Sequence, residues 1–346
     1  MTNNTSTREG RPRRDLVRAA LQMPTFHGLG VPDEDRFDHV ALTARSAERA
    51  GFDTVFVMDH LYQLMFLGGA SQPMLEGYSL LSELAGRTER VNLGTLVTGV
   101  TYRNPAHLGK IVTTLDVVSR GRAICGIGAA WYEEEHRAFG WDFPPLATRF
   151  EMLDAAITIL HGMFDGGPVD FAGRHFRTEG LVNVPTPLRR PPLLVGGSGE
   201  RRTIPLAAAR ADAVNFNCMV DEVPRKMEVL HRSLEGVGRE RDDINVTLLV
   251  SLVTAESATE VDALLRGMVA GRGMDPAMLD DPGFRAGLTA RMIVGTWEEV
   301  AERVGSLVSG PMAIDGCSFM LPAHVADSSG PEAVAEALRR AGVIAR

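Results

Sequence analysis

The sequence predicts a (βα)₈ barrel, and three observations carry that prediction. Short apolar runs alternate with amphipathic segments along nearly the whole chain, which is the pattern of strand and helix units around a parallel sheet. Eight of these runs are typical of strands, and eight parallel strands can close into a barrel. The length of 346 residues fits one such barrel with inserted segments as well as two smaller domains, so the strand count decides between them.

The predicted strands are apolar runs bounded by turn residues. They span 16–23, 54–58, 91–98, 122–128, 192–196, 212–217, 244–253 and 316–321. The run 244–253 is long for a strand, but Asn245, Thr247 and Ser251 stand at alternating positions along it. Such alternation is expected for a barrel wall with one polar side and one packed side.

Helical patterns lie between the strands and after the last one. They span 35–50, 75–87, 105–119, 146–163, 200–210, 222–234, 257–269, 296–308 and 331–341. In the first of them, Phe37, Val40 and Ala41 recur at three- and four-residue spacing, so one apolar stripe faces the sheet. Gly51 and Gly121 follow two of the helices, where a left-handed residue commonly ends a helix.

Two segments interrupt the alternation of strands and helices. Residues 164–192 are rich in Gly and Pro, and residues 272–291 contain two Asp-Pro pairs. We expect both to be inserted long loops, which in compact folds are commonly lids or binding walls. Residues 1–14 are expected to form a disordered tail, which leaves a single domain over 15–346.

Composition and charge exclude several classes of function. The formal net charge is -8 and no basic block interleaves with aromatic residues, which argues against a nucleic-acid partner. No apolar run reaches 18 residues and no signal-peptide core is found, so no membrane association is expected. Cys125, Cys218 and Cys317 lie far apart, which argues against a disulfide framework or zinc and favours a reducing cytoplasm.

In a (βα)₈ barrel the active site lies at the carboxyl ends of the strands, so the residues after each strand are the candidates. Asp59 and His60 follow the second strand, and an acid beside an imidazole suits proton transfer near neutral pH. The structural alternative is that Asp59 caps a turn while His60 packs. After the third strand, Gly99 predicts either a bulge beside a flat ligand or a simple turn into the next helix.

The fourth and fifth strands end in glycines. Gly126 and Gly128 remove side chains where a ligand could approach the backbone, but the third glycine of a dinucleotide motif is missing. The acidic run 133–136 that follows is interpreted as a solvated face, and no metal site is predicted. The run Gly196–Gly199 before a helix predicts a phosphate cradle of free amides, the alternative being a tight strand-to-helix turn.

Several segments taken together resemble one family. They are AERAGFD at 47–53 with MDH at 58–60, LVT at 96–98 with YRNP at 102–105, LDVVSRGR at 115–122 with GIG at 126–128, and VGGSG at 195–199. In order and spacing the chain resembles the bacterial luciferase-like oxidoreductases over residues 16 to 340, and most closely their branch that uses the deazaflavin coenzyme F420.

The resemblance implies a luciferase-like (βα)₈ TIM barrel, a homodimer, and F420 or alternatively FMN at the carboxyl ends of the strands. It implies that His60, with Asp59, lies beside the reactive ring. It also implies that a non-prolyl cis peptide near Thr98–Val100 supports the ring. The residues implied to bind the cofactor are Thr98, Gly99, Val100, Gly128, Ala129, Ala130, Trp131, Gly196, Gly197, Ser198 and Gly199, with Arg149 on the phosphate.

Two residues depart from relatives within that family. Ala129 stands where bacterial luciferase carries an arginine, so the flavin phosphate site of luciferase itself is not reproduced. Trp131 stands where the sugar-phosphate dehydrogenases carry a glutamate general acid, which argues against oxidation of glucose 6-phosphate.

Three functions are weighed. The first is F420-dependent hydride transfer to or from a small organic substrate, with His60 donating or accepting the proton. The second is an FMN-dependent luciferase-like monooxygenase, and the third a barrel that binds flavin without catalysis. Residues of the expected substrate walls suggest an apolar or aromatic pocket, although such residues also build cores and interfaces. They are Met65, Phe66, Trp131, Trp141 and Phe143.

Overall fold

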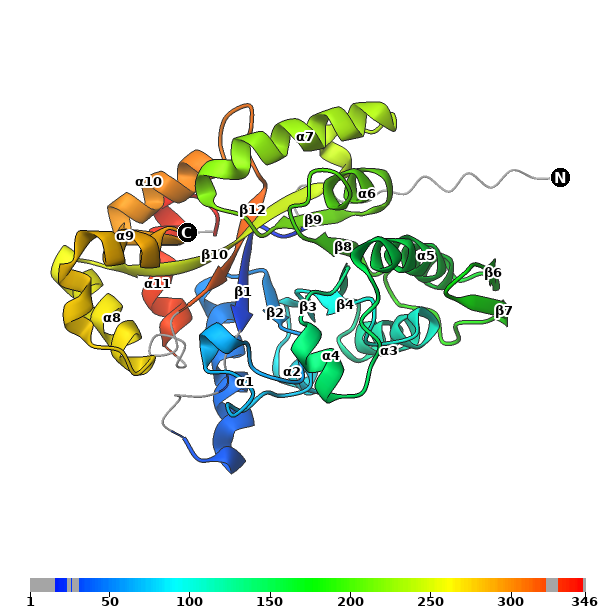
Figure 1. Ribbon diagram of the computed structural model, residues 1–346, viewed down its shortest axis with the longest axis horizontal. Coiled ribbons are helices and arrows are strands. Elements are labelled where there is room, and N and C mark those ends of the chain that lie inside the picture. The colour runs from blue at the N-terminus through cyan, green and yellow to red at the C-terminus, as the bar shows by residue number, and fades with distance from the viewer. Residues whose placement is uncertain (1–15, 24–25, 27–30, 322–328, 345–346) are drawn as a thin grey trace.

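Eight parallel strands close into a barrel in the computed structural model, which describes residues 16–23, 26, 31–321 and 329–344 (Figure 1). The strands follow the order β1, β2, β3, β5, β8, β9, β10 and β12, and β12 pairs with β1 to complete the ring. All eight predicted strands are therefore confirmed, and so is the predicted fold class. The expected tail over 1–14 lies outside the described residues.

The strands of the barrel are short and their register is regular. Their bounds are β1 Ala19–Met23, β2 Thr54–Val57, β3 Asn92–Thr95, β5 Ala123–Gly128, β8 Leu193–Gly196, β9 Ala213–Phe216, β10 Asn245–Ala255 and β12 Gly316–Met320. The predicted strand 91–98 is divided, because β4 (Thr98–Gly99) separates from β3 and pairs with the end of β5. β4 thereby adds a short step at the rim between β3 and β5.

Helices surround the barrel, and the nine predicted ones are confirmed within a few residues. The helices are α1 Arg36–Ala50, α2 Gly77–Arg87, α3 Pro105–Val118, α4 Glu133–Ala138, α5 Leu146–Asp165, α6 Thr203–Arg210, α7 Val223–Gly236, α8 Ala258–Gly271, α9 Pro282–Thr289, α10 Trp297–Leu307 and α11 Gly330–Arg340. None of these described helices combines the length and apolar character needed to cross a bilayer.

Alternation along each strand separates two layers of core. In β1, Leu21 packs toward the helices, whereas Ala20 belongs to the cluster that fills the barrel with Phe56 and Ile124. Polar residues occupy part of the interior as well: Nδ2 of Asn215 donates to Oγ1 of Thr247 at 2.7 Å. The interior is thus a packed core rather than a pore, which leaves the carboxyl ends of the strands as the rim available to ligands.

The two segments expected to be long loops contain regular elements, so that expectation was wrong in part, and their role as inserted lids or binding walls stays a prediction. Residues 164–192 contain the end of α5 and an antiparallel hairpin, β6 (Val169–Ala172) and β7 (Arg177–Leu181). The hairpin lies beyond α3 and α5 at the edge of the molecule (Figure 1). Asn183 anchors the chain after it by donating to Thr113 Oγ1 at 2.8 Å on α3.

Residues 272–291 hold a 3₁₀ helix, η6 (Pro276–Asp280), and α9 rather than a loop. They lead into β11 (Met292–Thr296), which pairs with the far end of β10 outside the barrel. A separate apolar cluster forms there, on the side of the molecule opposite the β6–β7 hairpin (Figure 1). The alternation pattern missed η6 and α9 because they are short and have few buried positions, and it missed β11 because that strand has only five residues.

Candidate functional site

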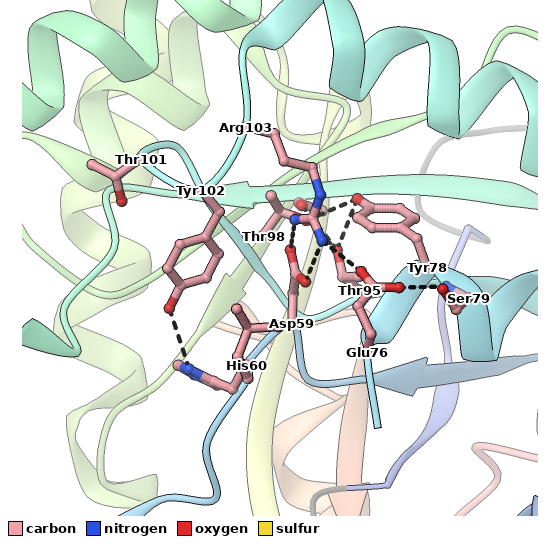
Figure 2. A network of polar contacts seen from close by, with 12 residues as sticks. Asp59, His60, Glu76, Tyr78, Ser79, Thr95, Thr98, Thr101, Tyr102 and Arg103 are labelled. Atoms are coloured by element: carbon pink, nitrogen blue, oxygen red, sulfur yellow. Dashed lines mark hydrogen bonds and ion pairs between the residues drawn. The ribbon is translucent and has the colours of Figure 1, made fainter. Parts of the chain in front are cut away.

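His60 follows β2 at the rim, and a carboxylate from another element holds its ring. The Nδ1 atom of His60 lies 3.1 Å from Oε2 of Glu135, which belongs to α4. Oη of Tyr102, in the loop before α3, lies 3.3 Å from the same nitrogen (Figure 2). Three segments that are distant in sequence therefore meet at one imidazole.

Glu135 is fully buried, and its carboxylate accepts hydrogen bonds from several surrounding groups. Besides His60, the hydroxyl of Tyr102 and the backbone amides of Leu61 and Tyr62 donate to it, the last at 2.9 Å. Burial raises the pKa of the Glu135 carboxyl, but the hydrogen bonds from His60 and Tyr102 outweigh burial and hold the pKa below its ordinary value of 4.5. Glu135 is therefore an ionised carboxylate at neutral pH.

The expectation of a solvated face over residues 133–136 was wrong for two of its members. Glu135 and His136 are both fully buried, because α4 turns them toward the barrel. The ring of His136 is bound on both sides: Nδ1 lies 2.7 Å from the carbonyl oxygen of Tyr132, and Nε2 lies 2.6 Å from Oγ1 of Thr101. From their polar character alone, these four residues could not be recognised as part of a short helix with one buried face.

The partners of His60 determine which nitrogen can react. A carboxylate only accepts hydrogen bonds, so Nδ1 beside Glu135 carries the hydrogen. No hydrogen bond joins Nε2 to any residue that the structure describes. The unshared pair of the neutral ring therefore lies on Nε2, and a protonated ring presents a donor there. This arrangement resembles the buried acid that orients a catalytic imidazole in hydrolases.

Asp59 was predicted beside the reactive ring, but its carboxylate turns to a different partner. Arg103 donates to it through two hydrogen bonds of 2.5 and 3.0 Å and also reaches Oε1 of Glu76 at 2.6 Å (Figure 2). Burial lowers the pKa of Arg103, but the Asp59 carboxylate outweighs burial and raises it above the ordinary value. Glu76 in turn caps α2 by accepting from the amide of Ser79 at 2.7 Å. The structure thus places Asp59 in an ion-pair network and His60 outside it.

A non-prolyl cis peptide joins Leu96 to Val97, immediately before the segment Thr98–Val100 to which the resemblance pointed. The Val97 side chain fills the space that the nearby glycines leave. A Cβ on Gly128 would stand 2.9 Å from Val97, and one on Gly196 would stand 2.7 Å from it. The absence of a side chain at Gly128 and Gly196 therefore makes room for the Val97 side chain, besides any ligand that contacts the backbone at the rim.

The predicted cofactor-binding segments do lie together. Gly99 is paired with Gly128 where β4 runs beside β5, and the carbonyl oxygen of Gly196 on β8 lies 3.4 Å from the position of a Gly128 Cβ. Ala129 and Ala130 follow at the rim with partly exposed side chains, and Trp131 is exposed. Thr98 is buried under the rim and Val100 packs into the outer core. The rim is thus lined by small residues over three neighbouring strands.

Arg149, predicted to contact a phosphate, lies in the first turn of α5 and supports this rim from below. Its guanidinium donates to the carbonyl oxygens of Ala129, at 3.2 Å, and of Ala130, and it stacks on Phe143 at 4.0 Å. Burial lowers the pKa of Arg149. Its observed contacts are therefore with the backbone that the resemblance assigns to the cofactor.

The loop Gly196–Gly199 leads from β8 to α6 and carries amides free for an anion. Gly197 adopts a φ of +127° and its amide donates to the carbonyl oxygen of Asn215 at 2.9 Å. The amides of Ser198 and Gly199 make no hydrogen bond to any described residue. The Ser198 hydroxyl accepts from the amide of Asn217 at 2.7 Å, which fixes the loop. Free amides at such a turn are suited to phosphate.

Sequence reasoning missed Glu135, Tyr102 and Arg103 as site residues. Tyr102 and Arg103 stood in the recognised YRNP segment, where the proline at the first turn of α3 already marked a loop at the rim. Glu135 gave no comparable signal, because three consecutive carboxylates obscure which one is buried. Among the described residues no group of three or more His, Cys, Asp or Glu side chains is placed to hold a metal ion.

The chain is similar to known proteins of one family. The model of the luciferase-like monooxygenase family matches residues 18–312. An F420-dependent glucose-6-phosphate dehydrogenase of Microbacterium testaceum (strain StLB037) is 31% identical over 60% of this chain and 61% of its own length. A dimethyl-sulfide monooxygenase of Hyphomicrobium sulfonivorans is 24% identical over 64% of this chain and 52% of its own length. The chain thus spans only about half to three fifths of these two curated relatives.

Solved structures share the same fold at low sequence identity. An F420-dependent secondary alcohol dehydrogenase, solved with an F420-acetone adduct, aligns with a TM-score of 0.73 at 17% identity and covers 94% of this chain and 99% of that one. The family match spans most of the chain and confirms the resemblance found in the sequence. The protein belongs to the luciferase-like monooxygenase family.

Proposed function

We propose that the protein is an F420-dependent oxidoreductase that transfers a hydride to or from a small organic substrate. The observation that carries the proposal is the position of His60. A buried carboxylate holds its Nδ1 atom, while Nε2 at the barrel rim has no hydrogen-bond partner among the described residues. Such a histidine is prepared to exchange a proton with a ligand lying across the rim.

The residues at the rim fit a cofactor with a flat ring and an anionic tail. Gly128, Ala129 and Ala130 present small side chains where a ring could lie, and the free amides of Ser198 and Gly199 could hold a phosphate. When bound, the deazaflavin supplies or accepts the hydride. The curated relatives named as F420-dependent dehydrogenases support this cofactor.

The protein's own residues manage the proton that accompanies the hydride. In oxidation of an alcohol, neutral His60 accepts the hydroxyl proton at Nε2, and Glu135 stabilises the imidazolium that results. In reduction of a carbonyl, the protonated ring returns the proton from the same atom. Tyr102 keeps the Glu135 carboxylate in place through its own hydrogen bond in both directions.

An FMN-dependent monooxygenase is the second candidate function. The similarity to a dimethyl-sulfide monooxygenase is the observation that favours it. A small-residue rim and a phosphate loop suit FMN as well as F420. A barrel that binds flavin without catalysis is the third reading, and the buried Glu135 behind His60 argues against it because mere binding needs no oriented proton donor.

Titration of the purified protein with oxidised F420 and with FMN in parallel tests the proposal. The proposal expects tighter binding of F420 than of FMN, followed by hydride transfer with at least one organic substrate. Tight binding of FMN alone would favour the monooxygenase. Binding without turnover of any alcohol, ketone or sugar phosphate would favour the non-catalytic barrel, and no binding of either cofactor would refute all three.

We also propose that the protein is cytoplasmic and that it is a homodimer, the latter because of the family resemblance. The three cysteines are free thiols, and those of Cys125 and Cys317 are buried, with burial raising the pKa of each to about 12. Unpaired inert thiols fit a reducing compartment. Light scattering in solution would test the assembly, with a mass of twice 37.4 kDa expected for a dimer.

A further inference from the structure

His136 is a fully buried histidine that takes no part in the proton exchange at His60. Its Nδ1 atom lies 2.7 Å from the carbonyl oxygen of Tyr132, and its Nε2 atom lies 2.6 Å from Oγ1 of Thr101. Because a carbonyl oxygen only accepts, Nδ1 carries the hydrogen and Nε2 accepts from the Thr101 hydroxyl. One bond thus secures the start of α4, and the other joins α4 to the loop between β4 and α3.

The helix that carries His136 depends on contacts with the rest of the protein. α4 has six residues, and the side chain of its N-cap residue, Tyr132, makes no capping hydrogen bond to the described residues. Of the six residues, Glu135 and His136 are buried. Helices this short are not stable by themselves. The position of the Glu135 carboxylate therefore depends on the contacts that these two buried side chains make.

Two neighbouring residues of α4 contact two neighbouring residues of the loop. His136 accepts from Thr101, and Glu135 accepts from the hydroxyl of Tyr102. Thr101 and Tyr102 follow one another on the loop beside His60 (Figure 2). The loop is thus fixed to the helix at two points, which sets the direction of the Tyr102 hydroxyl, 3.3 Å from Nδ1 of His60.

Aromatic packing around His136 does not by itself explain why this residue is a histidine. The ring of Tyr102 lies 5.0 Å from the His136 ring, and the ring of Phe143 lies 4.8 Å from it, between centroids. A phenylalanine would fill the same aromatic surroundings without polar atoms to bury. Burying an imidazole costs free energy unless its nitrogens are hydrogen-bonded, and here both are. The two hydrogen bonds therefore distinguish histidine at this position.

We propose, on the basis of the function proposed above, that His136 is a positioning residue of the reaction. Through Thr101 it holds the loop that carries Tyr102, and Tyr102 and Glu135 together keep the hydrogen of His60 on Nδ1. Without the bond between His136 and Thr101, the Glu135 carboxylate is free to move away from Nδ1. The His60 ring can then carry its hydrogen on Nε2, where it can no longer accept a proton from a ligand. His136 itself exchanges no proton.

The tautomer of His60 in the cofactor-free protein tests this inference directly. Nitrogen-15 NMR of histidine-labelled protein, at about pH 8 where an ordinary imidazole is neutral, distinguishes the two tautomers, and His60→Ala assigns the signals. We expect the wild type to hold the Nδ1–H form. In His136→Phe the ratio of the Nε2–H form to the Nδ1–H form should rise by about tenfold, which corresponds to the loss of one hydrogen bond.

Variants of both partners show whether the effect passes through Thr101. Thr101→Val removes the hydroxyl alone and should shift the His60 tautomers as far as His136→Phe does. The double variant should shift them no further, because both changes break the same contact. His136→Gln places an amide near the position of Nε2 and should restore the wild-type ratio in part. His136→Asn, whose amide lies near the position of Nδ1, should not.

Steady-state kinetics connect the tautomer with turnover. For a substrate that turns over in the assay of the proposed function, kcat at saturating F420 should fall by about tenfold in His136→Phe and in Thr101→Val. The KM for that substrate and the Kd for F420 should change by less than about twofold. His161→Phe is the matched control: the Nε2 atom of His161 lies 2.8 Å from the carbonyl oxygen of Arg210, away from the loop and α4. It should leave kcat and the His60 tautomer unchanged.

Three results would overturn the inference. The first is an unchanged His60 tautomer in Thr101→Val, a variant that removes no ring from the core and so stays informative if His136→Phe does not fold. The second is a double variant whose tautomer shift is the sum of the two single shifts. The third is a lower melting temperature of His136→Phe with kcat and tautomer retained, which would make His136 merely structural. If neither F420 nor FMN binds while the tautomer shifts as expected, the proposed function fails and the positioning of His60 by His136 stands.

Discussion

His60 and Glu135 are separated by 75 positions in the sequence, yet Nδ1 of one lies 3.1 Å from Oε2 of the other inside the protein. The carboxylate fixes the hydrogen on Nδ1 and leaves Nε2 without a hydrogen-bond partner among the described residues. Asp59, the immediate neighbour of His60, is engaged by Arg103 instead. Two carboxylates near one histidine thus have different roles, one orienting the ring and one anchoring the strand end.

Replacing Glu135 tests the orienting role. Glu135→Gln keeps the shape of the side chain but can donate a hydrogen bond to Nδ1, which would favour the wrong tautomer of His60. We expect kcat to fall by about 10² to 10⁴-fold, by analogy with loss of an orienting acid in other enzymes. Turnover with the cofactor at saturation measures it, and Glu133→Gln on the exposed face of the same helix is the control. Unchanged turnover in Glu135→Gln would remove Glu135 from the mechanism.

The depressed pKa of Glu135 also predicts a contribution to acid stability. The folded state holds this pKa below 4.5, so the ionised group stabilises the fold fully above its ordinary value, and that contribution is lost as the pH falls through the lower folded value. The free energy of unfolding of the wild type should therefore decline between pH 5 and more acid conditions. Urea denaturation as a function of pH should show a shallower decline for Glu135→Gln, and an equal decline would show that Glu135 does not contribute.

Asp59 is predicted to position the site without exchanging protons. It is 2% exposed and paired with Arg103, so Asp59→Asn leaves a partly buried guanidinium with fewer counter-charges and should destabilise the fold by about 3 kcal/mol. Because His60 and Tyr102 adjoin the pair in sequence, kcat should fall as well, while the shape of its pH profile is retained. Loss of one limb of that profile in Asp59→Asn would instead make Asp59 a proton donor or acceptor.

Gly197 tests the role of the loop after β8 in holding the anionic tail. A side chain at its φ of +127° is strained, so Gly197→Ala should displace the neighbouring amides and weaken cofactor binding by about tenfold. Gly180→Ala in the β6–β7 hairpin, where a φ of +56° lies in the left-handed region and strains alanine less, is a control outside this loop. Equal Kd values for F420 in wild type and Gly197→Ala would show that this loop does not hold the cofactor.

The barrel could be predicted from sequence because buried parallel strands repeat one strong pattern eight times. The pattern fails where elements are short or exposed: α4 has six residues, and the β6–β7 hairpin has few buried positions. The number of strands therefore fixed the architecture, while the inserted elements were mistaken for loops.

The site was predictable only in part. Residues after the strands, such as His60 and Gly197, are marked by their place in the barrel. The partner of His60 is not marked in this way. The choice between Asp59 and Glu135 depends on how Arg103 and α4 are placed in three dimensions. Local sequence around Glu135 shows only a charged run, and burial of one carboxylate among three is a tertiary property.

The most direct test of the central claim is kcat for His60→Ala, measured on protein whose Kd for F420 has been determined in the same preparation. Loss of the proton donor and acceptor should lower kcat by about 10² to 10⁴-fold while F420 affinity changes little. If the His60→Ala variant loaded with F420 turns over at the wild-type rate, the proton travels by another route and the contact between His60 and Glu135 is structural.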